Sequence, residues 1–168
     1  MKVKLQQVSP AQIEARSMEI ISQELGGRHF APLEEQVIKR VIHTTADFDY
    51  ADSLTFSPGA VQQGIRLLRQ GVTIVTDTRM AQAGINKPAA ERFGCRVLCF
   101  MGDEDVAAEA KARGCTRAAA AMEKAARLPG PVLFAVGNAP TALVRLYELA
   151  SEERLIPAMV IGVPVGFV

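Results

Sequence analysis

Little net charge and no long apolar run limit what this chain can be. Its 168 residues carry 19 basic and 18 acidic side chains, a net charge of +1, so no general nucleic-acid-binding surface is indicated. Hydrophobic residues make up 49% of the chain and charged residues 22%, which is typical of a folded protein and excludes general disorder. A small molecule is therefore the expected partner, and nucleic acid is not.

The chain also lacks the apolar segments of secreted and membrane proteins. The N-terminal sequence MKVKLQQVSP has no apolar signal core, and no stretch is long enough to span a bilayer. The length suits one compact core and is short for two. We therefore expect a cytoplasmic protein without a membrane partner, formed by one domain over residues 1–168.

Few residues are available for metal or redox chemistry. The three cysteines include no CxxC pair, and Cys95 and Cys99 lie in the apolar run CRVLCFM, where we expect reduced, buried thiols that act as small hydrophobic groups. A zinc site needs four well-spaced ligands, and the two histidines lie far from these cysteines, so no metal site is expected. The motifs GxGxxG, GxxxxGK[ST] and GxSxG are absent, which gives no support to nucleotide cofactors or serine-hydrolase chemistry.

Helical patterns occupy the N-terminal part of the chain. Ser9 followed by Pro10 predicts a helix start, and Gly26-Gly27 predicts its end after residue 25. A second helix should begin at Pro32, with apolar residues at helical spacing up to residue 42. A third is expected from Ser57-Pro58 to about residue 69. We therefore expect an N-terminal helical segment.

Continuous apolar runs then alternate with helical stretches. The runs at 72–76, 96–101, 132–136 and 159–163 are typical of parallel strands that are covered on both faces. Helices are expected between them, at 105–113, 117–127 and 140–150. The fold class predicted is α/β, a single domain with a mostly parallel sheet flanked by helices. Ligands of such sheets bind outside the carboxyl ends of the strands, which here carry glycine and small polar residues.

The stretch VIHTTADFDYADSL is the strongest candidate for chemistry. His43 is one of only two histidines, and imidazole is the side chain whose ordinary pKa lies near neutrality. On position alone, the favoured interpretation of His43 is a helix-end residue that interacts with the last carbonyl groups. The nearby Asp47, Asp49 and Asp52 are more typical of turns and helix caps than of a metal site. Asp77, at a strand end, is interpreted as a structural residue or as a support for a neighbouring site residue.

Several separated segments carry a family resemblance. They are IHTTADFDY, SPGAV, VTIVTDTRMAQAGI, GCTRAAAAM, AVGNAPTAL and VIGVPVGFV. In order and spacing the chain resembles the precorrin-8X methylmutase family, also called precorrin isomerases, from about Val8 to its last residue. The resemblance implies an isomerase of cobalamin biosynthesis that moves a methyl group between adjacent ring-C carbons of a tetrapyrrole, without a cofactor.

The resemblance also implies roles for four residues. His43 lies in the context of the family's acid–base histidine, and Ser17 matches a serine that contacts the substrate. Arg117, and with it Arg40, would pair with the acetate and propionate groups of the substrate. Arg40 and His43, three residues apart, should share a helix face. His29 has no such support and is expected to be a solvated loop residue.

Two other functions remain open at this point. A tetrapyrrole-binding or carrier protein would keep the fold and the carboxylate contacts without turnover. A generic nucleotide-binding module would need phosphate binding at Gly137-Asn138 or Gly102-Asp103.

The apolar C-terminal sequence adds an expectation about assembly. The family normally continues for several dozen residues beyond VIGVPVGFV, and an uncovered apolar strand edge is an aggregation hazard. We therefore expect a homodimer, and poor activity of this 168-residue form compared with a longer one.

Overall fold

Two groups of elements make up the fold, an N-terminal set of helices and a C-terminal α/β unit. The computed structural model describes residues 9–165; the first eight residues and the last three, which end the predicted apolar terminus, lie outside this range. We expected one domain over residues 1–168, and the chain forms two compact units, Met1–Gln62 and Gln63–Val168. Within the described residues, 9–62 and 63–165 therefore form two packing units.

The first unit is helical, as predicted. Its helices are α1 (Pro10–Leu25), α2 (Pro32–Thr45) and α3 (Tyr50–Ser53). Proline lies in the first turn of α1 and of α2, and α1 ends at Gly26, whose φ of 58° suits glycine. Ile21 and Leu25 of α1 pack with Ile38 and Ile42 of α2 in one buried cluster. This packing fixes which faces of α1 and α2 remain outside the cluster.

The second unit is built on a parallel sheet. Within the described residues its strands are β1 (Thr73–Thr76), β2 (Arg96–Leu98), β3 (Val132–Val136) and β4 (Met159–Gly162). They lie in the order β2-β1-β3-β4, and every pair is parallel. After β1 the chain places β2 on one side of β1, and it then places β3 on the other side. The carboxyl ends of β1 and β3 therefore form the topological switch point of the sheet. The α/β class and the parallel sheet are confirmed.

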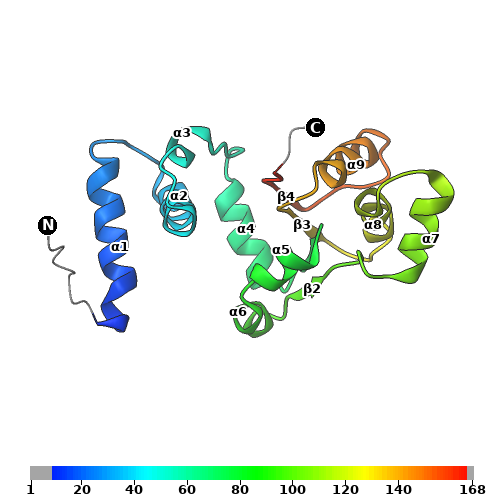
Figure 1. Ribbon diagram of the computed structural model, residues 1–168, viewed down its shortest axis with the longest axis horizontal. Coiled ribbons are helices and arrows are strands. Elements are labelled where there is room, and N and C mark those ends of the chain that lie inside the picture. The colour runs from blue at the N-terminus through cyan, green and yellow to red at the C-terminus, as the bar shows by residue number, and fades with distance from the viewer. Residues whose placement is uncertain (1–8, 166–168) are drawn as a thin grey trace, which may run out of the picture. The chain divides into compact units, whose positions relative to one another are not determined.

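Helices cover both faces of this sheet. They are α4 (Ala60–Arg69), α5 (Arg79–Gly84), α6 (Lys87–Arg92), α7 (Glu104–Arg113), α8 (Arg117–Ala125) and α9 (Pro140–Ser151). Leu67 of α4 and Ala90 of α6 pack with Ile74 and Leu133 of the sheet. The opposite face carries α7, α8 and α9 (Figure 1). The unit is therefore a three-layer α/β/α arrangement.

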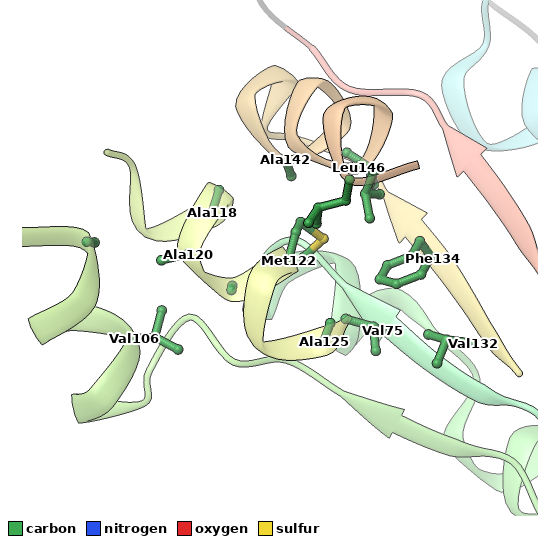
Figure 2. Close-up of a cluster of buried hydrophobic side chains, with 14 residues drawn as sticks. Val75, Val106, Ala118, Ala120, Met122, Ala125, Val132, Phe134, Ala142 and Leu146 are labelled. Atoms are coloured by element: carbon green, nitrogen blue, oxygen red, sulfur yellow. The ribbon is translucent and has the colours of Figure 1, made fainter. Parts of the chain in front are cut away.

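The larger core lies between the sheet and helices α7 to α9. Figure 2 shows Met122 of α8 beside Leu146 of α9, with Phe134 of β3 below them. Met122 and Phe134 are fully buried, and each such side chain contributes roughly 1.5–3 kcal/mol. Four alanines of α8 are buried as well, Ala118, Ala120, Ala121 and Ala125, and their small size lets α7 and α9 pack closely on either side.

Some sequence expectations about this unit are wrong. The strand expected to extend to residue 101 ends at Leu98, and Cys99 is half-buried, whereas Cys95 is buried as predicted. We expected all four strands to be covered on both faces, but Val160 and Ile161 of the edge strand β4 are exposed. The short helices α5 and α6 were not expected, and neither was α3 in the first unit. Thr78 and Asn86 cap α5 and α6 by accepting hydrogen bonds from Ala81 N and Ala89 N.

Candidate active site

His43 lies half-buried in the last turn of α2. Other donors satisfy the carbonyl groups around it. The hydroxyl of Thr44 donates to the carbonyl oxygen of Arg40 at 3.0 Å, and that of Thr45 to the carbonyl oxygen of Val41 at 2.9 Å. The N–H of Ala46 donates to the carbonyl oxygen of Ile42 at 2.7 Å. None of these three hydrogen bonds uses the imidazole of His43.

Arg40 and His43 share a face of α2, and a carboxylate of α1 contacts this face. Arg40 Nη2 donates to Glu14 Oε1 at 2.8 Å, and both side chains are more than half exposed. The hydrogen bond and charge of Arg40, helped by the charge of His43, lower the pKa of the Glu14 carboxyl against a smaller opposing effect of burial. Glu14 therefore lies within electrostatic reach of both predicted site residues, and the sequence reasoning missed it.

Ser17 lies one helical turn after Glu14 on α1. It is half-buried, and its hydroxyl donates to the carbonyl oxygen of Ile13 at 2.9 Å. This is the local bond expected of a serine inside a helix. The ion pair between Glu14 and Arg40 joins the two helices that carry Ser17 and His43. The first unit thus holds three of the four predicted site residues on a pair of packed helices.

The neighbouring aspartates act in the turn and not as metal ligands. Asp47 Oδ1 accepts from the N–H of Asp49 at 2.9 Å, which makes an Asx turn. Asp52 accepts from Arg28 Nη1 at 2.8 Å, and Asp49 stands at the N-cap of α3 without capping it through its side chain. Within residues 9–165, no group of three or more His, Cys, Asp or Glu side chains could hold a metal ion.

Arg117 belongs to the second unit, where it is the first residue of α8. Thr116 caps this helix, since its hydroxyl accepts from the N–H of Ala119 at 3.2 Å. Thr116 also donates to Thr141 Oγ1 at 2.9 Å. The exposed Arg117 lines a cavity of about 600 Å³ beside α7. The three residues of the first unit and Arg117 are thus held by separate sets of contacts.

The switch point of the sheet is occupied by a carboxylate of the protein itself. Asp77 follows β1, is 0% exposed, and accepts hydrogen bonds from the N–H groups of Gly137, Asn138 and Ala139 at 3.1, 2.8 and 2.6 Å. These amides lie in the loop before α9, so Asp77 joins the end of β1 to a loop that is 60 residues away in the sequence. The structural role predicted for Asp77 is confirmed. A phosphate cannot use the same amides, which removes the nucleotide site considered at Gly137-Asn138.

Comparison with known proteins agrees with this fold over nearly the whole chain. A model of the precorrin-8X methylmutase family matches residues 12–168. A cobalt-precorrin-8 methylmutase of Priestia megaterium is 44% identical over 161 residues, which cover 96% of this chain and 72% of the relative. One of Salmonella typhimurium is 46% identical over 165 residues, covering 95% of this chain and 77% of the relative.

A solved structure shows the same fold. The precorrin-8X methylmutase of Thermus thermophilus superposes with a TM-score of 0.83 at 42% identity, covering 94% of this chain and 76% of the other. The architecture is that of an α/β protein with an N-terminal helical unit and a parallel sheet. The chain belongs to the precorrin-8X methylmutase family.

Proposed function

We propose that this chain is an isomerase of cobalamin biosynthesis that moves a methyl group between adjacent ring-C carbons of a corrin precursor. The substrate is precorrin-8X or cobalt-precorrin-8, and the product is hydrogenobyrinate or its cobalt-containing counterpart. The family match over residues 12–168 carries the proposal, because it includes Ser17, Arg40, His43 and Arg117. An intramolecular migration consumes no methyl donor and transfers no electrons, so we propose no cofactor.

His43 is the proposed proton donor. Protonation of the conjugated macrocycle draws electron density from the ring and eases migration of the methyl group. Histidine is the side chain most often used to donate a proton in this way, which suits this step. The Glu14 carboxylate and the Arg40 guanidinium are in contact, so their opposite charges balance each other beside this part of α2. A site that holds the macrocycle bent toward the product geometry would lower the barrier further.

The substrate's acetate and propionate groups are the proposed partners of the arginines. A guanidinium can hold a carboxylate through two parallel hydrogen bonds, which suits Arg117 at the rim of its cavity. Arg40 is hydrogen-bonded to Glu14 in this structure, so a substrate carboxylate must compete with the Glu14 carboxylate for the Arg40 guanidinium. Ser17 is proposed to orient a ring substituent, for which its hydroxyl would exchange the bond to Ile13.

Assembly as a homodimer is a further part of the proposal. Within the described residues β4 pairs only with β3, and its Val160 and Ile161, with the following Val163, are exposed. A second copy that covers this edge would remove the exposed apolar surface. Sedimentation at micromolar concentration tests the proposal, which a monomer would contradict. Within residues 9–165 no helix has the length and apolar character to cross a membrane, and the cytoplasmic location stays a prediction.

Incubation with precorrin-8X tests the proposed activity. Conversion to the absorption spectrum of hydrogenobyrinate identifies an isomerase. Tight binding without spectral conversion would identify the carrier function instead.

A further inference from the structure

The cavity beside α7 and α8 has an uneven charge. Its volume is about 600 Å³, and it is lined by Ala107, Ala108, Ala110, Lys111, Gly114, Cys115 and Arg117. Two of these side chains are cationic and none is acidic. Such a lining favours an anionic ligand.

The backbone explains how two cations reach one cavity. On α7, Lys111 lies four residues after Ala107 and three after Ala108, so both alanines neighbour the lysine on the helix surface and leave space beside it. Gly114 ends α7 in the left-handed conformation, with a φ of 63°, and lets the chain turn into α8 within three residues. Arg117 thereby meets the same cavity from the start of the next helix.

Lys111 and Arg117 also differ from the neighbouring arginine. Arg113 pairs with Glu109 at 2.9 Å and with Glu123 at 3.2 Å. Within residues 9–165, neither Lys111 nor Arg117 makes an ion pair with a protein carboxylate. The two cations that line the cavity are thus the ones left available to a ligand.

We propose that Lys111 is a second substrate-binding cation, which acts with Arg117 on the carboxylates of the tetrapyrrole periphery. This inference rests on the proposed function and adds to it a preference for a tetrapyrrole whose side arms end in free carboxylic acids. Arg117 holds a carboxylate through its fork, and Lys111 acts as a mobile point charge on a neighbouring one. Together they select a macrocycle with ionised side arms over one whose arms are neutral amides.

Calorimetric titration of the 168-residue protein with two ligands tests the inference. One ligand is hydrogenobyrinate with free carboxylates, and the other is the same corrinoid with its side-arm acids converted to primary amides. Lys111→Gln should weaken binding of the acid about fivefold to tenfold, a loss between that of an exposed ion pair and that of a charge-assisted hydrogen bond. Its binding of the amide should stay within about twofold of the parent's. Lys111→Arg, which keeps the charge, should bind the acid within twofold of the parent.

Lys87→Gln is the matched control, because Lys87 lies at the start of α6, is exposed, and belongs to the opposite face of the sheet. It should change acid binding by less than twofold. Acid binding by Lys111→Gln that equals the parent's would overturn the inference, and so would equal losses in Lys111→Gln and Lys87→Gln. If the parent binds neither corrinoid, the proposed function fails, and this inference with it.

Discussion

Removal of the Asp77 carboxylate should destabilise the second unit strongly. The side chain is fully buried and accepts three backbone N–H bonds, from Gly137, Asn138 and Ala139, at 3.1, 2.8 and 2.6 Å. A hydrogen bond to a charged group contributes about 1.5–3 kcal/mol, and each buried donor left without a partner costs about 1–3 kcal/mol. The three bonds share one carboxylate, and water can enter the space left by truncation. We therefore expect Asp77→Ala to lower the free energy of unfolding by about 4 kcal/mol.

Two variants sharpen this test. Asp77→Asn keeps one acceptor oxygen and should cost about half as much, roughly 2 kcal/mol. Asp103→Ala removes a partly exposed carboxylate that pairs with Lys124. Because Lys124 keeps Asp105 as a partner, this control should cost under about 1 kcal/mol.

Urea unfolding measures each loss. Hydrogen exchange at the amides of Gly137, Asn138 and Ala139 should accelerate in Asp77→Ala well before the core of the sheet exchanges. A loss below 1 kcal/mol, or unchanged exchange at these amides, would refute the role of Asp77 in holding the loop before α9.

Three further predictions concern the site and the buried charges. His43→Ala should reduce turnover about a hundredfold to ten-thousandfold with little change in thermal stability, and parental turnover would reject the proton-donor role. Arg117→Lys should weaken substrate binding by about 1.5–3 kcal/mol, because the charge stays while the bidentate fork is lost, and an unchanged titration would leave Arg117 a surface role. Glu123→Gln should destabilise the protein by about 3 kcal/mol, because its 3% exposed carboxylate binds Arg113, Arg145 and Arg154, and chemical denaturation measures this loss.

The pH dependence of stability follows from the same Glu123 cluster. Burial raises the pKa of the Glu123 carboxyl, but the hydrogen bonds and charges of the arginines, above all Arg145, outweigh it and leave the pKa below its ordinary value. A lowered folded-state pKa stabilises the protein above the ordinary pKa of the unfolded chain, and this contribution is lost as the pH falls through the folded-state value. Unfolding midpoints measured below pH 4.5 should therefore fall less steeply in Glu123→Gln than in the parent.

Local signals in the sequence predicted most of the long elements. Proline at the start of α1 and α2, and continuous apolar runs at β1 and β3, are properties that neighbouring residues determine by themselves. The six-residue helices α5 and α6 are too short for a hydrophobic period to be recognised, although Thr78 and Asn86 are typical cap residues. The exposure of β4 could not be predicted, because it depends on the strand's place at the sheet edge.

The site was predictable only in part. His43 was identified because few side chains in this sequence can move a proton near neutral pH, and the family resemblance added Ser17, Arg40 and Arg117. The ion pair between Glu14 and Arg40 joins residues 26 positions apart and depends on how α1 and α2 rotate when their apolar faces pack. The cavity that unites Lys111 with Arg117 likewise depends on the turn at Gly114.

The most direct test of the account follows the absorption spectrum of precorrin-8X during incubation with this protein and with His43→Ala. The account predicts conversion to the hydrogenobyrinate spectrum by the parent, however slow, and binding without conversion by the variant. Binding without conversion by both proteins would contradict an isomerase, and equal conversion by both would contradict the role of His43.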